Sequence, residues 1–194
     1  MRTICRAVGM LAPPAAAVIV LVAGLLTPGY DPMTRTVSRL AAPGMPAAFE
    51  VDLAIALAGI ACLALGIQIE VARAALLAAA GGFLVAAVVH LDPASSAATW
   101  SHRAASAVAV LGLTAAPLAM WRVYGRVLLA LGTAELAMLA VAAVLLAAPF
   151  NEWGAWERVI LLLGLTSLVV MARRMPSTDD PAKPRAAIQS SAGT

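Results

Sequence analysis

The chain has little charge and few aromatic residues. Charged residues make up 12% of its 194 residues and aromatic residues 5%, whereas hydrophobic residues make up 62%. A soluble domain carries roughly 25% charged residues, so this composition excludes an ordinary soluble domain. We therefore expect the folded chain to lie in a lipid bilayer.

Lysine and cysteine are nearly absent. The only lysine is Lys183, near the C-terminus, which excludes a retinal Schiff base inside a helix bundle. The two cysteines, Cys5 and Cys62, lie at different predicted membrane depths, so we expect no disulfide between them. The sequence also lacks a Gly-rich phosphate loop, a His-Glu-x-x-His motif and a Gly-x-Ser-x-Gly motif. We therefore expect no resident cofactor.

Long apolar runs dominate the remaining sequence. They cover residues 7–27, 47–69, 74–90, 104–121, 127–149 and 156–172. Each run is close to the ~20 residues that a helix needs to cross ~30 Å of hydrocarbon, and none alternates as a barrel strand does. The sequence predicts an all-α, polytopic integral membrane protein, a six-transmembrane-helix bundle over residues 1–174. Residues 175–194, rich in Pro, Ser, Ala and Asp, are predicted to form a disordered cytoplasmic tail.

Positive charge is distributed unevenly between the predicted loops. With both termini inside, nine of the thirteen cationic residues face the cytoplasm; the other four are Arg35, Arg39, Arg103 and Arg158. This asymmetry predicts an N-in, C-in orientation in a bacterial plasma membrane. Most aromatic residues lie at the ends of the runs, as interfacial residues do. Topology thus explains the net charge of +3 without a nucleic-acid partner.

The first outer loop and the start of the second helix contain several candidate ligands. Asp31, Arg35 and Ser38 lie in a connection of nearly twenty residues, long enough to favour a function or a packed segment. The arginines here either extend to lipid phosphates or form a specific anion site. Asp52 falls on a helix face with small residues, so we expect it to face the bundle and to pair with an outer arginine.

The connection between residues 90 and 103 holds both histidines. Ser101 is a candidate N-cap for the fourth helix, which would place His102 and Arg103 in its first turn. The favoured interpretation has His90 at a helix end and His102 hydrogen-bonded to a carboxylate; a pH-sensitive switch is a second. A metal held by His90, Asp92 and His102 is a third.

One acid lies inside a predicted membrane span. Glu135 is in the fifth apolar run, where an ionisable residue indicates a functional site by default. Thr133, Thr166 and Ser167 lie at a suitable depth to hydrogen-bond to it. Glu135 is predicted either to brace the bundle as a neutral acid or to relay protons.

Four motifs together carry a family resemblance. They are residues 28–38 (Pro-Gly-Tyr-Asp-Pro-Met-Thr-Arg-Thr-Val-Ser), Asp92-Pro93, His102 at the fourth helix, and Gly154-Ala155-Trp156-Glu157-Arg158. In this order the chain resembles, over residues 10–172, the bacterial six-helix membrane family called domain of unknown function 998. His90 and Arg39 depart from the pattern of that family. The resemblance implies the fold and supports the outer residues, but it implies no reaction.

These observations predict a non-enzymatic membrane protein that binds a lipid headgroup or a membrane-protein partner through an outer polar cluster. The cluster consists of Asp31, Arg35, Ser38, Asp52, Asp92, His102, Arg103, Glu157 and Arg158. Its arginines would neutralise phosphate. The alternative is a metal-assisted lipid hydrolase with Asp52 or Asp31 as its base. A proton-coupled carrier that uses Glu135 is the third interpretation.

Overall fold

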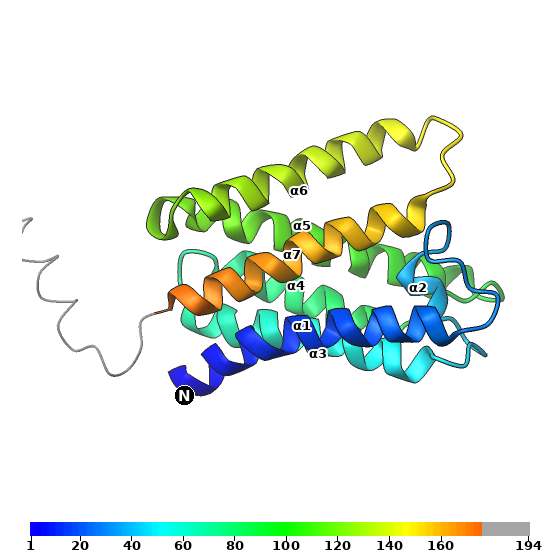
Figure 1. Cartoon of the computed structure of the whole chain (residues 1–194), viewed down its shortest axis with the longest axis horizontal. Helices are drawn as coiled ribbons and strands as arrows, with labels where there is room; N and C mark the ends of the chain where they lie inside the picture. The colour runs from blue at the N-terminus through cyan, green and yellow to red at the C-terminus, as the bar shows by residue number, and fades with distance from the viewer. Residues whose placement is uncertain (176–194) are drawn as a thin grey trace, which may run out of the picture.

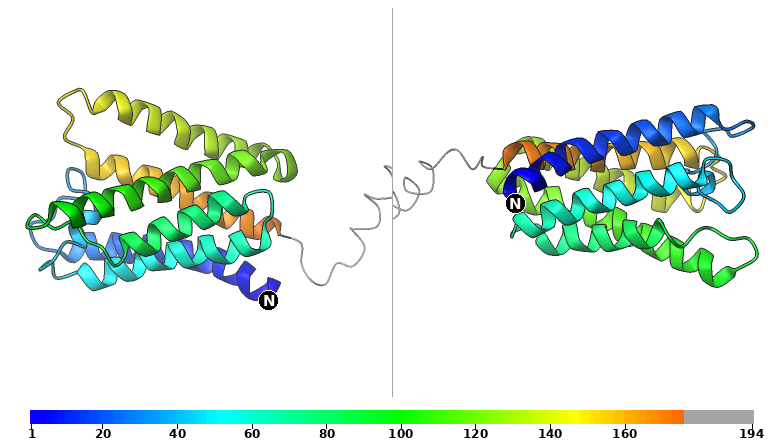
Figure 2. Two further views of the ribbon diagram at one scale, coloured as in Figure 1. Left: turned by 180° about the vertical axis from the view of Figure 1, so that it is seen from behind. Right: turned by 90° about the horizontal axis from the view of Figure 1, so that it is seen from below.

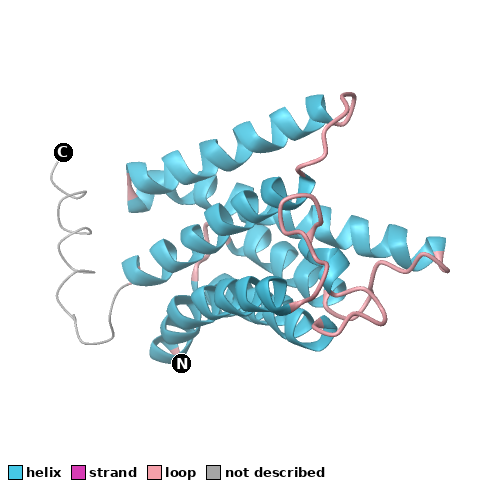
Figure 3. Cartoon of the chain, turned by 45° about the vertical axis from the view of Figure 1, so that its right-hand side comes forward, coloured by secondary structure: helices cyan, strands magenta, loops and turns pink. Residues whose placement is uncertain are grey.

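The computed structural model describes residues 1–175, and these residues form helices joined by loops (Figure 1, Figure 3). The helices are α1 (Arg2–Leu26), α2 (Val37–Leu40), α3 (Ala48–Gln68), α4 (Arg73–Ala86), α5 (Ser96–Tyr124), α6 (Arg126–Leu145) and α7 (Trp153–Arg174). The predicted tail, apart from its first residue, lies outside the described residues. The all-helical membrane bundle expected from the apolar runs is confirmed.

Five helices, α1, α3, α5, α6 and α7, are long and apolar enough to cross a membrane, and α4 is a shorter apolar helix. The prediction of a helix over residues 74–90 was wrong at its end, because α4 stops at Ala86. The chain then turns, and the carboxylate of Asp92 accepts a hydrogen bond from the amide of Ala94 at 2.8 Å. Fourteen residues at ~1.5 Å each span only about 21 Å.

The six longer helices run back and forth along one axis (Figure 1, Figure 2). Helices α1, α3, α4 and α5 follow one another as packed neighbours, and α7 lies against α1, α5 and α6. Helix α6 is at the edge of the bundle, and its buried residues, Leu128, Gly132 and Glu135, all lie in its first half. Its second half diverges from α7 (Figure 1).

Small residues allow α4 and α5 to approach closely. A Cβ atom added at Gly82 would lie 2.6 Å from the amide nitrogen of Ala109, and one added at Gly112 would lie 2.5 Å from the carbonyl oxygen of Ala75. Such contacts between small residues are typical of membrane helices, which gain stability from packing rather than from the hydrophobic effect.

The two ends of the bundle differ in charge. The N-terminal end, where α1 begins and α7 ends, has one acid among the described residues, Glu70, and seven arginines: Arg2, Arg6, Arg73, Arg122, Arg126, Arg173 and Arg174. The opposite end, which we call the loop end, contains the 27–47, 87–95 and 146–152 connections. Its four arginines lie among six acids. The helices thus gather the charges as the sequence indicated.

Candidate functional site

Arg158 of α7 binds the main chain of the first connection, residues 27–47 between α1 and α3. One of its terminal nitrogens donates to the carbonyl oxygens of Pro32 at 2.6 Å and Arg35 at 3.1 Å. The other donates to the phenol oxygen of Tyr30 at 2.7 Å. These contacts engage both terminal nitrogens of the guanidinium. Arg158 therefore fixes the path of the first connection, and Arg35 takes part through its carbonyl.

Two neighbours of Arg158 hold the same connection. The carboxylate of Glu157 accepts a hydrogen bond from the amide of Val37, at the start of α2, and lies 3.5 Å from the hydroxyl of Ser38. A Cβ atom added at Gly154 would lie 2.6 Å from the carbonyl oxygen of Pro32. The residues between 154 and 158 that resembled a family motif therefore fasten α7 to the first connection.

Asp31 forms a local turn on the exposed side of this connection. Its carboxylate accepts hydrogen bonds from the amide of Met33 at 2.9 Å and the hydroxyl of Thr34 at 2.8 Å. The Met33 amide, followed by the Thr34 hydroxyl, holds the pKa of Asp31 below its ordinary value. Burial has the opposite effect on Tyr30 and raises the pKa of its phenol. The hydrogen bonds of the Asp31 carboxylate thus stay within its own loop.

Asp52 pairs with a histidine. Its Oδ2 lies 2.9 Å from Nε2 of His90, so the expectation of an arginine partner was wrong. The pairing arises because the connection after α4 folds back over the start of α3. The other oxygen of Asp52, Oδ1, is buried and has no hydrogen-bond partner among the described residues. His90, which departs from the family pattern, is thus the side chain that contacts Asp52.

His102 lies deeper in α5 than predicted. The helix begins at Ser96, and the hydroxyl of Ser95, not Ser101, caps it by accepting from the Ala98 amide at 3.3 Å. His102 is only 2% exposed. Its Nδ1 lies 2.6 Å from the carbonyl oxygen of Val89, so the expected carboxylate partner was wrong. A carbonyl only accepts, which places a hydrogen on Nδ1 and leaves a lone pair on Nε2 of the neutral ring.

The three residues of the alternative metal site do not converge. His90 binds Asp52, Asp92 caps its own turn, and His102 binds a main-chain carbonyl. Within residues 1–175 the structure contains no group of three or more His, Cys, Asp or Glu side chains placed to hold a metal ion. Arg103 is also separate, since it is exposed and lies over the ring of Trp100, 5.5 Å from its centroid.

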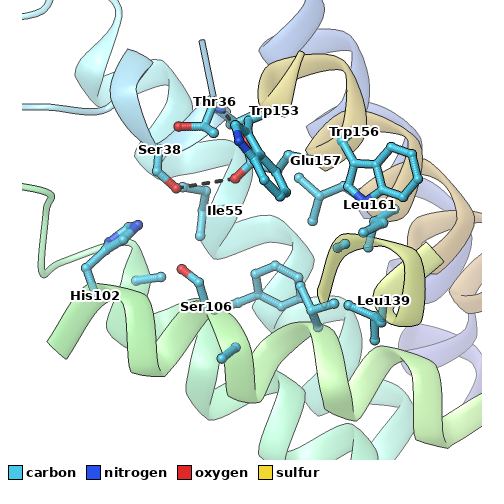
Figure 4. A pocket seen from close by; sticks show the side chains of 17 residues that line it. Thr36, Ser38, Ile55, His102, Ser106, Leu139, Trp153, Trp156, Glu157 and Leu161 are labelled. Atoms are coloured by element: carbon cyan, nitrogen blue, oxygen red, sulfur yellow. Dashed lines mark hydrogen bonds between the residues drawn. The ribbon is translucent and has the colours of Figure 1, made fainter. Parts of the chain in front are cut away.

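His102 instead lines a cavity of about 310 Å³ between α5, α6 and α7, bounded by α2 at the loop end (Figure 4). Polar side chains come from Thr36, Ser38, His102, Ser106 and Glu157. The apolar wall consists mainly of the side chains of Ile55, Phe83, Val110, Leu139, Trp153, Trp156, Ile160 and Leu161. None of the lining residues is an arginine or a lysine.

Two lining groups have unused hydrogen-bonding capacity. Nε2 of His102 and Nε1 of Trp156 are buried and have no partner among the described residues. The indole N–H donates and the free imidazole nitrogen accepts. Because leaving such groups unpaired costs about 1–3 kcal/mol each, the cavity favours an occupant that both donates and accepts. This role was not predicted for Trp156, which resembled an interfacial aromatic residue, or for Ser106.

A second, more apolar cavity of about 250 Å³ lies between α1, α3 and α7. Val37, Ile55, Phe83 and Leu161 line both cavities and so lie between them. Among residues 1–175, Arg158 is the only charged residue that lines this second cavity.

Glu135 is fully buried where α5, α6 and α7 meet. Its two carboxyl oxygens lie 3.1 Å from the hydroxyl of Thr114 and 3.3 Å from that of Ser167. Ser167 was expected here, but Thr133 and Thr166 donate to carbonyls of their own helices instead. The Thr114 hydroxyl also lies 3.0 Å from the carbonyl oxygen of Val110. The Thr114 hydroxyl has one hydrogen but two possible acceptors, the Val110 carbonyl and the Glu135 carboxyl. A protonated Glu135 satisfies this arrangement, because its own O–H donates to the Thr114 oxygen and leaves the Thr114 hydrogen for Val110.

Comparison with known proteins identifies a family for most of the chain. Residues 10–174 match the model of a family described as protein of unknown function (DUF998). No curated protein and no solved structure matches the chain significantly.

Proposed function

Since this chain belongs to DUF998, a family of proteins of unknown function, we propose a function from its own cavity: it is a non-enzymatic membrane protein that binds an uncharged amphiphile. The ligand is a lipid whose head is a hydroxyl or an amide. The observation that carries the proposal is that two unpartnered groups, His102 Nε2 and Trp156 Nε1, belong to residues that line one cavity.

A hydroxyl or amide head fits the polar groups of the cavity. Its N–H or O–H donates to His102 Nε2, and its oxygen accepts from Trp156 Nε1 or from the hydroxyl of Ser106. His102 and Ser106 extend from α5 on one side of the cavity, and Ser38 and Glu157 face them from the other (Figure 4). The head thus lies among four polar side chains that three separate segments supply.

The hydrocarbon part of the ligand fits the other wall. Val110, Leu139, Ile160 and Leu161 line it, and the transfer of apolar area from water contributes roughly 25 cal/mol per Å². Leu139 belongs to the half of α6 that has no buried residue. An amphiphile reaches the cavity from the bilayer on this side, between α6 and α7.

Charge argues against a phosphate in this cavity. No cationic side chain lines it, Glu157 contributes a carboxyl group, and Arg158 is directed to the first connection. We therefore replace the phosphate-binding role expected of Arg35, Arg103 and Arg158 with binding of a neutral head. The excess of arginine at the N-terminal end supports an N-in, C-in orientation in a bacterial plasma membrane, with the cavity in the outer half.

A chain-matched pair of lipids tests the proposal. Full-length protein in neutral detergent is titrated with dioleoylglycerol and with dioleoylphosphatidic acid, which differ only in the phosphate. Dioleoylglycerol is expected to bind at least tenfold more tightly. Trp156→Phe, which removes the N–H and keeps an aromatic ring, is expected to weaken its binding by about fivefold to tenfold, the worth of one neutral hydrogen bond of ~1 kcal/mol. His102→Leu is expected to weaken it at least as much.

Two variants serve as controls. Trp100→Phe changes an exposed tryptophan and His90→Gln changes the histidine outside the cavity, so neither is expected to alter binding by more than twofold. Equal affinity for the two lipids, or unchanged binding in folded Trp156→Phe, contradicts the proposal. Native mass spectrometry of the purified protein then identifies the neutral lipid that it retains.

A further inference from the structure

Four arginines lie at the N-terminal end of the bundle, opposite to the loop end. Arg122 lies in the last turn of α5, Arg126 begins α6, and Arg173 and Arg174 end α7. All four are exposed. We call these residues the arginine cluster. It belongs to neither cavity and has no part in the proposed binding of a neutral lipid.

A direct contact brings the two segments of the arginine cluster together. The guanidinium of Arg174 donates to the carbonyl oxygen of Tyr124 at 2.5 Å. A Cβ atom added at Gly125 would lie 3.5 Å from the same guanidinium. Gly125 has a positive φ of 95°, which makes the tight turn between α5 and α6 possible. The end of α7 therefore packs on the turn that carries Arg122 and Arg126.

The positive charge of the arginine cluster is not neutralised within residues 1–175. The single ion pair in that part of the chain joins Asp52 and His90 at the loop end. Arg122 lies over the ring of Trp121, 5.4 Å from its centroid. That contact, and the carbonyl that Arg174 binds, are interactions with neutral groups. The cluster thus presents several guanidinium groups to one region without a carboxylate.

Aromatic residues place the arginine cluster at the depth of lipid headgroups. Trp121 and Tyr124 lie in the last turn of α5, just before the turn, and such rings prefer the boundary between hydrocarbon and water. Guanidinium groups bind phosphate oxygens in a planar, bidentate geometry. Basic pockets between helix ends are also a recognised way to bind anionic lipid headgroups. We propose that the arginine cluster binds the phosphate of an anionic membrane phospholipid.

The experiment compares lipids with identical chains. Full-length protein in neutral detergent is titrated with dioleoylphosphatidylglycerol, dioleoylphosphatidylcholine and inorganic phosphate, and bound lipid is counted by native mass spectrometry. Phosphatidylglycerol is expected to bind at least tenfold more tightly than phosphatidylcholine, and inorganic phosphate is expected not to compete at millimolar concentration. Arg122→Gln combined with Arg126→Gln is expected to reduce the binding of phosphatidylglycerol by roughly fivefold for each arginine removed.

The matched control removes the same charge from the loop end. Arg39→Gln combined with Arg103→Gln changes two exposed arginines and is expected to leave the affinity for phosphatidylglycerol within twofold. Arg122→Lys with Arg126→Lys is expected to retain part of it. Equal losses in the two glutamine pairs mean a general charge effect and overturn the proposal.

Two further results would also overturn it. One is equal affinity of the wild type for the two phospholipids. The other is a preference that appears only after Asp179→Asn and Asp180→Asn, which would identify the acids of the chain itself as the occupant. Binding of dioleoylglycerol is expected to be the same in all of these variants, so failure here is distinct from failure of the cavity proposal.

Discussion

The guanidinium of Arg158 donates to the carbonyl oxygen of Pro32 at 2.6 Å, across 126 positions of the chain. This contact joins α7 to the connection between α1 and α3. The same nitrogen also donates to Arg35 and to Gly154 of its own helix. One side chain therefore sets the position of the first connection at the loop end.

Replacement of Arg158 is expected to destabilise the fold strongly. Arg158→Gln removes several charge-assisted hydrogen bonds, and such bonds contribute about 1.5–3 kcal/mol each. We expect the free energy of unfolding to fall by roughly 3 kcal/mol, measured by denaturant titration in detergent. Arg103→Gln, which loses only a stacking contact on Trp100, is expected to cost less than about 1 kcal/mol. Similar losses in both variants would disprove the special role of Arg158.

Replacement of glycine by alanine is expected to have opposite effects on stability at Gly154 and at Gly81. Gly154→Ala forces a methyl group to within 2.6 Å of the Pro32 carbonyl oxygen, and such overpacking costs about 1–3 kcal/mol. Gly81→Ala, in α4, meets nothing within 4 Å and is expected to stabilise the helix by up to about 1 kcal/mol. Thermal unfolding of the two variants side by side measures the difference. A stable Gly154→Ala protein would show that the first connection is free to move.

Alkaline pH is expected to loosen the first connection through Tyr30. Burial raises the pKa of this phenol above its ordinary value, so the folded state favours the neutral form. That stabilisation is fully present below the unfolded pKa of about 10 and is lost as the pH rises through the higher folded pKa. The chain has two tyrosines. The difference in tyrosinate absorbance between wild type and Tyr30→Phe isolates the titration of Tyr30, and a midpoint at or below that of a model phenol contradicts the expectation.

Glu135 is expected to tolerate an amide but not a truncation. Glu135→Gln keeps an acceptor and replaces the O–H donor of the protonated carboxyl with an N–H donor for the site of Thr114 and Ser167, so we expect the free energy of unfolding to change by less than about 1 kcal/mol. Glu135→Ala leaves both hydroxyls without this partner and opens a cavity, at a cost of about 2–4 kcal/mol. Denaturant titration distinguishes the two variants. If Glu135→Gln abolishes proton-coupled flux in proteoliposomes while stability is unchanged, a carrier role replaces the bracing role.

The sequence was sufficient for the features that depend on neighbouring residues. Continuous apolar runs located the helices, and the spacing of arginines separated the two ends of the bundle. Glu135 was expected to meet a hydroxyl from another helix, and Ser167 provides one. These features follow from hydropathy and helical periodicity, which act over one or two turns of a helix.

The candidate site depends on contacts between distant residues, which the sequence does not reveal. Asp52 and His90 are 38 positions apart, and both looked suitable for other partners. His102 turned out to bind a carbonyl of the preceding connection because α5 starts earlier than its polar residues suggested. Trp156 lines a cavity whose other walls come from α5 and α6, and the packing of these helices is not evident from the sequence around Trp156.

Only the first half of α6 contains buried residues, and this determines the concentration scale on which the affinity for a lipid is expressed. The first half of the helix is fixed by Gly132 and Glu135, and its second half, beside the cavity, has no buried residue. A lipid that enters between α6 and α7 comes directly from the bilayer and never passes through water. The relevant concentration is then the mole fraction of that lipid in the surrounding leaflet. Occupancy of the cavity would follow membrane composition even for a lipid with almost no aqueous solubility.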